Sequence, residues 1–176
     1  MMQRIAIDMD EVMADTMARY LSLYNADFNL DLTPAYFHGR RIFDAIPEEH
    51  HERAFSYFEQ ESFFADIDVM PGSQEVIRAL QDRYDIFVST AAMDVPCSFS
   101  AKYHWLQRHF PFIPTSNIVF CGDKSIVAAD FLIDDNTRHL SNFRGEGIVY
   151  TAPHNIAESR FRRVNNWEEV RAMFLS

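Results

Sequence analysis

The chain has 176 residues, of which 48% are hydrophobic and 14% aromatic, and its formal net charge at pH 7 is −10. This length fits one domain, or one domain with a modest insertion, and so much apolar material excludes a disordered chain. The acidic balance argues against non-specific binding of DNA or RNA, which requires neutralising cations. A nucleotide in a pocket stays compatible with it, because a bound metal ion can reverse the local field.

The cysteines and the lengths of the apolar runs indicate the cellular compartment in which the protein is expected. Cys97 and Cys121 are the only cysteines, so no disulfide framework is indicated and a reducing cytosol is the default. No apolar run approaches the roughly 20 residues that span a bilayer. Asp8 and Asp10 interrupt the first apolar stretch at once, unlike a secretory signal. We expect a cytoplasmic protein that binds neither a membrane nor a nucleic-acid polymer.

The chain begins with a short apolar run that ends in acidic residues. Residues 5–7 are too few for a buried helix and are typical of a strand buried on both faces. Asp8 and Asp10 follow directly. The carboxyl ends of the strands line the ligand crevice of an open α/β sheet, so both carboxylates are expected there. Two carboxylates held close together repel, and the pKa of one rises unless a cation lies between them.

The stretch after this strand has a helical character. Apolar residues at three- and four-residue spacing predict a helix over 12–26. Pro47 suits the first turn of another helix, and a run of aromatic residues follows it. We expect most of these aromatic residues to form the core of a small helical subdomain. The Pro71-Gly72 pair is then the clearest break in the chain.

Beyond this break, short apolar strands alternate with helices. The expected strands are 86–88, 118–120, 131–133 and 148–150. Ser73 is expected to cap the first of the intervening helices. Asn166 and Glu169 have capping-box spacing for the last helix.

Strand–helix alternation of this kind predicts an α/β fold with a doubly wound parallel sheet. The core is expected to comprise residues 1–14 and 71–176. Residues 15–70 are expected to form a small helical cap, inserted just after the first strand. Its place beside the crevice makes this insertion a candidate lid.

Several predicted strands end in groups that can perform chemistry. These groups are Asp8 and Asp10, Thr90, Lys124, and Asp134 with Asp135. In a parallel sheet all of these strand ends lie along one edge. The set suits phosphoryl transfer: Mg²⁺ held by carboxylates offsets the repulsion between a phosphate and a carboxylate nucleophile, while a lysine and a hydroxyl hold phosphate oxygens. An aspartate nucleophile divides the displacement into two easier steps through an aspartyl-phosphate.

The same residues resemble a known family. Asp8-Met9-Asp10-x-Val12, Thr90 at a strand end, Lys124 and Ile133-Asp134-Asp135 stand in the order of the four motifs of the haloacid dehalogenase superfamily of phosphatases. Pro71-Gly72, Lys102-Tyr103-x-Trp105, Asp123-Lys124 and Ala129-Asp130-x-Leu132-Ile133-Asp134-Asp135 resemble the 5′(3′)-deoxyribonucleotidases, the cytosolic and mitochondrial pyrimidine nucleotidase branch. This resemblance covers nearly the whole chain and implies a haloacid dehalogenase-like Rossmannoid core with a cap.

The resemblance implies roles for the acidic residues. Asp8 would be the nucleophile. Asp10 would protonate the leaving ribose oxygen and then activate water as a base. Mg²⁺ would be held by the Asp8 side chain, the backbone carbonyl of Asp10 and Asp135, and Asp134 would orient this shell or share in it.

The resemblance also implies how the substrate, a small nucleoside monophosphate, is bound. Thr90 and Lys124 would bind the phosphate, next to Asp10. Phe58 stands near the place where an aromatic residue of the lid stacks on the base in relatives, although it is also expected to serve the core of the cap. The protein would be a monomer or a homodimer.

Some positions depart from the pattern of the animal enzymes. Glu11 replaces the glycine that usually follows the second aspartate, which puts another carboxylate near the site. Ala91 and Asp94 stand where those enzymes carry a hydroxyl and a lysine that helps to select substrate, and Thr16 replaces a pocket phenylalanine. We expect these changes to alter base and sugar preference and to leave the phosphatase chemistry intact.

Two other functions are compatible with the sequence. The first keeps the fold and the chemistry but acts on another small phosphomonoester, such as a sugar phosphate. The second is a non-enzymatic phospho-switch like a receiver domain, which also combines acids, Mg²⁺, a hydroxyl and a lysine. In receivers, however, the acidic pair is contiguous, the phosphorylated aspartate follows the third strand, and no 50-residue insertion follows the first.

Overall fold

One parallel sheet organises the protein. The computed structural model describes residues 2–176, apart from the side chain of Asp94. Within this range six strands form a sheet: β1 (Gln3–Ile7), β2 (Tyr84–Thr90), β3 (Ile118–Phe120), β4 (Phe131–Asp134), β5 (Glu146–Tyr150) and β6 (Arg162–Val164). Their order is β3-β2-β1-β4-β5-β6 and each neighbouring pair is parallel. The predicted doubly wound α/β class is confirmed.

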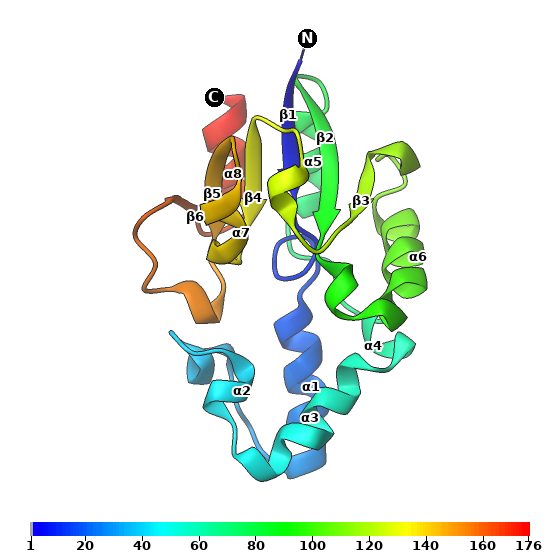
Figure 1. Cartoon of the computed structure of the whole chain (residues 1–176), viewed down its shortest axis with the longest axis vertical. Coiled ribbons are helices and arrows are strands. Elements are labelled where there is room, and N and C mark those ends of the chain that lie inside the picture. The colour runs from blue at the N-terminus through cyan, green and yellow to red at the C-terminus, as the bar shows by residue number, and fades with distance from the viewer. Residues whose placement is uncertain (1) are drawn as a thin grey trace.

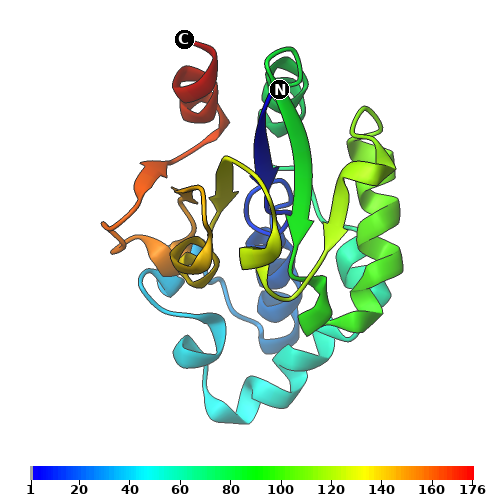
Figure 2. The same cartoon turned by 45° about the horizontal axis from the view of Figure 1, so that its top comes forward.

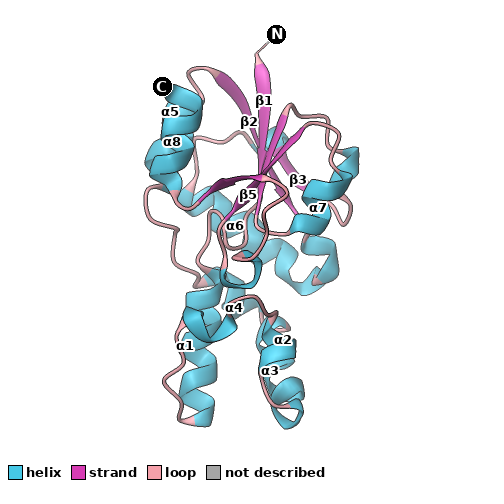
Figure 3. Cartoon of the chain, turned by 90° about the vertical axis from the view of Figure 1, so that its left-hand side faces the viewer, coloured by secondary structure: helices cyan, strands magenta, loops and turns pink. Residues whose placement is uncertain are grey.

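Helices lie on both faces of the sheet and beyond one end of it. They are α1 (Thr16–Phe28), α2 (Ile42–Ala45), α3 (His51–Phe58), α4 (Glu61–Ala65), α5 (Ser73–Leu80), α6 (Phe99–His109), α7 (Thr137–Asn142) and α8 (Trp167–Leu175). Helices α5 and α8 pack on each other at one face of the sheet, and α7 lies at the other (Figure 3). Helix α6 runs beside β3 and contacts α4 (Figure 2). None of the described helices is long and apolar enough to cross a membrane.

Helices α1 to α4 gather beyond the carboxyl ends of the strands, whereas both chain termini lie at the opposite end of the molecule (Figure 1). The chain passes from the core to these helices after β1 and returns before α5. The two passages lie side by side, because the Asp15 N–H donates to the Asp68 carbonyl at 2.9 Å and the Met70 N–H donates to the Met13 carbonyl at 2.8 Å. The helical end of the molecule is therefore tied to the core next to the strand ends.

Strand β1 is buried on both faces, as its apolar sequence predicts. Ile5 and Ile7 belong to the large core that includes residues of α5 and α8, among them Val76 and Val170. Ala6 belongs to a smaller core with Leu132, Val149 and Leu140 of α7. Alternating side chains of one strand thus fill two layers, because successive residues of a strand point to opposite faces.

The predicted helix over 12–26 begins at the wrong residue, since α1 starts at Thr16. The preceding segment is a loop in which the N–H groups of Met13 and Ala14 both donate to the Met9 carbonyl at 2.9 Å. Glu11 in this loop has φ of +60°, which no α-helix permits. The side chain of Asp15 then caps the helix by accepting from the Ala18 N–H. Apolar spacing alone does not reveal such a loop, because its apolar residues are also buried.

Two other local predictions need correction. Ser73 is the first residue of α5 and its side chain does not cap the helix; Gly72, at φ of +80°, occupies the cap position. Strand β6 was not predicted, because Arg162-Arg163-Val164 contains no apolar run. It forms because β5 offers a free edge, and Arg163 donates to Thr151 and Asn155 beside it.

The predicted cap of the last helix is partly right. The Asn166 side chain accepts from the Glu169 N–H at 3.0 Å, as a capping residue does. The Glu169 carboxylate, however, accepts from the N–H of Asn165 and not of Asn166. The reciprocal bond of a capping box is thus displaced by one residue.

Candidate active site

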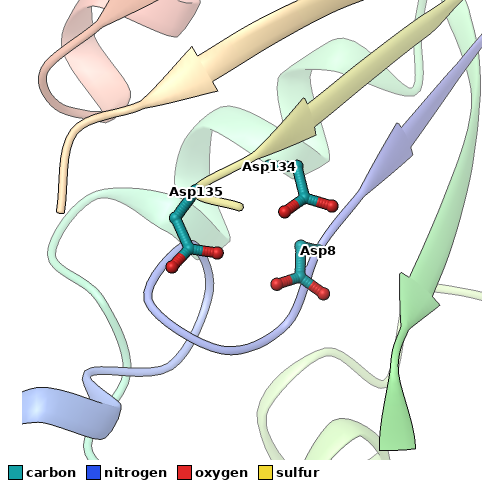
Figure 4. A group of neighbouring side chains, drawn as sticks. All are labelled: Asp8, Asp134 and Asp135. Atoms are coloured by element: carbon teal, nitrogen blue, oxygen red, sulfur yellow. The ribbon is translucent and has the colours of Figure 1, made fainter. Parts of the chain in front are cut away.

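The site lies where the order of the strands reverses. The chain progresses from β1 through β2 to β3 in one direction and from β4 to β6 in the other, so the crevice opens between the ends of β1 and β4. Asp8 follows β1, and its N–H donates to the Ile133 carbonyl of β4 at 2.9 Å. Asp134 ends β4 and Asp135 follows it. Figure 4 shows the three carboxylates of Asp8, Asp134 and Asp135 directed toward a common space.

The loop after Asp8 is fixed from the far end of the chain. The indole N–H of Trp167, the first residue of α8, donates to the Val12 carbonyl at 2.8 Å. Trp167 itself is fully buried. The loop that carries Asp8 and Asp10 therefore belongs to the rigid core, which is what a preorganised site requires.

Lys124 is completely buried between two of these acids. Its Nζ donates to Asp8 Oδ1 and to Asp134 Oδ2, each at 2.6 Å. Burial lowers the pKa of this ammonium, but the charges of Asp8 and Asp134 outweigh that effect and raise it above its usual value. The other oxygen of Asp134 accepts from the Asn136 N–H at 2.8 Å. Both oxygens of Asp134 thus hold neighbouring protein groups.

The acidic cluster carries more negative charge than Lys124 neutralises. Burial raises the pKa of Asp8 to about 6 against the opposing charge of Lys124. Burial and the charge of Asp8 raise the pKa of Asp135 well above its usual range. Oxygens of Asp8, Asp134 and Asp135 lie within 4.8 Å of one another. Buried oxygen donors with unbalanced negative charge fit a hard divalent cation such as Mg²⁺.

Asp10 is held from two sides. The Thr16 hydroxyl at the start of α1 donates to Asp10 Oδ1 at 3.1 Å. Lys102 of α6 donates to Asp10 Oδ2 at 2.5 Å and to Thr90 Oγ1 at 3.4 Å. The core and the helices beyond the strand ends therefore both contribute to the position of this carboxylate.

A cavity of about 380 Å³ opens above these groups, between the strand ends and α1 to α4. A pocket of this size accommodates a small molecule. Its lining includes acids and cations of the core side together with apolar residues of the helical side: Asp8, Asp10, Glu11, Lys102, Asp135, Met17, Ile42, Phe43, Phe58 and Phe64. Phe58 lines the cavity while its ring also stacks on Tyr20, with ring centroids 5.9 Å apart. Phe58 thus belongs to the core of the helical end as well as to the pocket wall.

The structure brings the sequence-predicted residues to one place. Asp8, Asp10, Thr90, Lys124, Asp134 and Asp135 lie around the crevice, and Phe58 lines the opposite wall. Lys124 and Asp8, which are in direct contact, stand 116 positions apart in the chain.

The positions that depart from the animal pattern also lie at the crevice. Glu11 lines the cavity, and its carboxylate accepts from the Met17 N–H at 2.5 Å. Burial raises the pKa of Glu11 to about 8. Ala91 also lines the cavity, whereas the side chain of Asp94 lies outside the described part of the chain.

Lys102 is the main site residue that the sequence did not single out for a role. In the sequence it stands only within the motif Lys102-Tyr103-x-Trp105, because nothing local links it to Asp10, 92 positions away. A signal existed nevertheless. Lys102 and Lys124 are the only lysines of the chain, and all of its other permanently charged basic side chains are arginines. Both are buried at the site.

Solved structures of other proteins resemble this fold. A haloacid dehalogenase family hydrolase from Deinococcus radiodurans, whose structure contains bound phosphate and sodium, superposes with a TM-score of 0.64 at 12% identity, covering 98% of this chain and 94% of that one. A hydrolase of the same kind from Bacillus subtilis, bound to magnesium, gives a TM-score of 0.61 at 14% identity and covers 99% of both chains. The chain therefore has the α/β fold of haloacid dehalogenase-like hydrolases.

The sequence comparisons are more specific. Residues 1–176 match the family described as 5′ nucleotidase, deoxy (pyrimidine), cytosolic type C protein. The 5′(3′)-deoxyribonucleotidase of Bacillus subtilis is 37% identical over 174 residues, which cover 97% of this chain and 98% of that protein. A protein of Staphylococcus epidermidis is 45% identical over 174 residues, covering 99% of this chain and 97% of its own. The chain belongs to this nucleotidase family, and it is a phosphoric monoester hydrolase of the deoxyribonucleotidase-like class.

Proposed function

We propose that this protein is a Mg²⁺-dependent phosphomonoesterase that hydrolyses (deoxy)nucleoside 5′(3′)-monophosphates through an aspartyl-phosphate on Asp8. The observation that carries the proposal is the position of Asp8. It lies at the floor of a cavity of about 380 Å³, paired with the buried Lys124 and facing Asp135. A carboxylate in this setting is accessible from the cavity and is held in one orientation.

Asp8 and Asp135 would hold the metal ion, with the backbone carbonyl of Asp10. Asp134 would have a supporting role, because its two oxygens already accept from Lys124 and Asn136. The ion, when bound, offsets the negative charge of the phosphate beside that of the carboxylates. The raised pKa values of Asp8 and Asp135 support this assignment, because burial and the neighbouring acids both disfavour their charged forms, and a bound cation would offset this cost.

The chain's own groups would divide the reaction between them. An Asp8 oxygen attacks phosphorus, the bond from phosphorus to the sugar oxygen breaks, and Asp10 gives that oxygen a proton. Asp10 then takes a proton from water, and the resulting hydroxide attacks phosphorus; the bond from phosphorus to the Asp8 oxygen breaks, which releases inorganic phosphate and the free Asp8 carboxylate. Thr90 and Lys124 would hold phosphate oxygens, because Lys124 donates to Asp8, and the Thr90 hydroxyl accepts from Lys102, which also donates to Asp10.

The walls of the cavity support a nucleoside as the leaving group. Phe43, Phe58 and Phe64 line the side of the cavity that faces the acids. Aromatic faces of this kind stack on a planar base. The named relative from Bacillus subtilis points to the same substrates. We further propose that residues 15–70, which carry these walls, act as a cap over the bound nucleotide.

The strand order argues against the receiver-like switch. Receiver domains follow the order 2-1-3-4-5, whereas this sheet follows 3-2-1-4-5-6. A sugar phosphate as substrate remains the alternative that the experiment must separate.

The test is phosphate release from dUMP, dTMP, the corresponding ribonucleotides and a set of sugar phosphates, with Mg²⁺ and with EDTA. We expect turnover of the nucleotides with Mg²⁺ alone. Asp8→Asn should lower kcat by about three orders of magnitude or more, because it removes the nucleophile. Asp82→Asn is the matched control, since Asp82 is exposed in the turn before β2 and is absent from the cavity lining.

The outcomes separate the candidates. Release from sugar phosphates at rates that exceed those of all nucleotides would replace the substrate while keeping the chemistry. No release from any nucleotide would reject the proposed function. Full activity of Asp8→Asn would reject Asp8 as the nucleophile.

A further inference from the structure

The second buried lysine, Lys102, has no assigned role in the proposed reaction. It is 4% exposed, on α6, and an ammonium group at such a depth is costly unless charged or polar partners surround it. The partners are Asp10 Oδ2 at 2.5 Å, Thr90 Oγ1 at 3.4 Å and the ring of Phe64, whose centroid lies 5.0 Å away. Asp10 and Phe64 also line the cavity.

The two lysines of the site have different partners. Lys124 contacts Asp8, the proposed nucleophile, and Asp134. Lys102 contacts Asp10, the proposed acid and base. The two positive charges are thus distributed so that each aspartate of the Asp8-Met9-Asp10 segment has a lysine of its own.

The orientation of Asp10 depends on Lys102 because little else of the core holds its side chain. One oxygen faces Lys102 and the other accepts from Thr16 on α1. The Asp10 side chain is 30% exposed, so it has room to adopt other rotamers if a partner is lost. A proton donor must face the leaving oxygen, and a misplacement of about 1 Å can cost roughly 100-fold in rate.

We propose that Lys102 is a positioning residue for Asp10: it aims the Asp10 carboxyl at the leaving oxygen and carries little of the affinity for phosphate. This inference rests on the proposed function, in which Asp10 is the acid and base. The shorter distance to Asp10 than to Thr90 supports positioning over phosphate binding. The role has a distinctive consequence, because only a poor leaving group needs the proton that Asp10 supplies.

The test compares Lys102→Met with the wild type on two substrates that differ in the basicity of the leaving oxygen. The leaving group of dTMP is a strongly basic sugar alkoxide, whereas the leaving group of p-nitrophenyl phosphate is a weakly basic phenolate. Methionine keeps the length and apolar stem of the side chain, so that the packing on Phe64 persists. The first step is measured in a single turnover for dTMP and as the burst of nitrophenolate for p-nitrophenyl phosphate.

We expect Lys102→Met to slow the first step with dTMP by roughly 100-fold, the size of a general-acid contribution. The nitrophenolate burst should stay within about threefold of the wild type, and its subsequent steady state should slow, since water activation also needs Asp10. Inhibition by inorganic phosphate should be unchanged. Lys124→Met should differ by slowing the first step with both substrates.

Equal losses with the two substrates, or a large rise in the inhibition constant of phosphate, would overturn the inference in favour of phosphate binding. Unchanged rates with both would overturn it too. Thr16→Val, which removes the other partner of Asp10, provides a second variant and should show the same selectivity. If the wild type consumed neither substrate, the proposed function would fail, and the inference with it.

Discussion

Glu11 is held in a conformation and a protonation state that are both unusual for its type. At φ of +60° it occupies the left-handed region, which costs an L-residue of this kind about 1 kcal/mol. Its carboxylate is held at the start of α1 by the Met17 N–H, near Asp8, Asp10 and Asp15. A glycine at this position would avoid the backbone cost.

Glu11 predicts a dependence of stability on pH. Its pKa is raised from 4.5 to about 8 by burial, so its contribution to stability is complete below pH 4.5 and is lost as the pH rises through about 8. In EDTA, Glu11→Gln should raise Tm at pH 8.5 by about 3 °C or more, relative to its effect at pH 5. Glutamine keeps an oxygen for the Met17 N–H and has no charge to lose.

The measurement is the difference in Tm between variant and wild type across this pH range. Glu52→Gln, an exposed position of α3, is the matched control and should show a flat difference. An equally flat difference for Glu11→Gln would contradict the raised pKa.

Replacement of Lys124 should lower the stability of the fold as well as the activity. Lys124→Met removes the cation between Asp8 and Asp134 and leaves both buried acids unpaired. We expect a loss of about 3 kcal/mol at pH 7.5, measured by urea unfolding without metal. The loss should shrink at pH 5, because the acids can then take up protons. A loss that is independent of pH would show that packing, and not charge, is the cause.

At this scale the sequence predicts the acids but not all of their partners. Asp8, Asp134 and Asp135 can be placed because each follows an apolar run and the carboxyl ends of parallel strands meet. Lys102 cannot be placed in this way, since its contact with Asp10 depends on how α6 packs against the strand ends.

The elements that were predicted best are the buried strands, because apolar runs bounded by polar residues leave few alternatives. Strand β6 and the start of α1 were not predicted correctly for the same physical reason. In both places, contacts with distant residues override the local pattern: β5 recruits Arg162–Val164, and the Met9 carbonyl closes the loop before Thr16. Local spacing therefore predicts buried apolar strands better than it predicts elements or boundaries that depend on contacts with distant residues.

In the connection from α7 to β5, adding a single methyl group at Gly145 should strongly lower the stability of the fold. A Cβ at Gly145 would lie 2.4 Å from the Asp130 carbonyl oxygen and 2.7 Å from that of Ala129. The Asp130 carbonyl cannot easily retreat, because it accepts from the Glu146 N–H at 2.8 Å. Gly145→Ala should therefore lower the free energy of unfolding by about 3 kcal/mol.

The control for this prediction is Gly122→Ala. A Cβ at Gly122 would meet the Met93 Cβ at 3.6 Å, an ordinary contact, so little change is expected. Denaturant unfolding of both variants provides the comparison. Similar stabilities of the two variants would contradict the steric argument.

For the whole molecule, the acidic cluster predicts that a divalent ion stabilises the fold. At a Mg²⁺ concentration of about 100 times its Kd, linkage gives about 2.7 kcal/mol, or a rise in Tm of roughly 5–10 °C. The rise should be smaller at pH 5.5 than at pH 8, because Asp8 and Asp135, whose pKa values are raised, must lose protons to bind the ion.

Asp135→Asn should abolish most of this rise, and thermal unfolding with and without EDTA measures it. Asp85→Asn, exposed on β2 away from the cavity, is the control. A rise of equal size in Asp135→Asn would show that the ion binds elsewhere.

The position of the two chain ends has a practical consequence. Both lie at the end of the molecule opposite to α1–α4 (Figure 1), whereas the cavity lies between the strand ends and these helices. An affinity tag, a fluorophore or a covalent tether to a bead can therefore be attached to either end while small molecules still diffuse into and out of the cavity. The same arrangement lets two such enzymes be fused tail to head with both entrances facing the solvent.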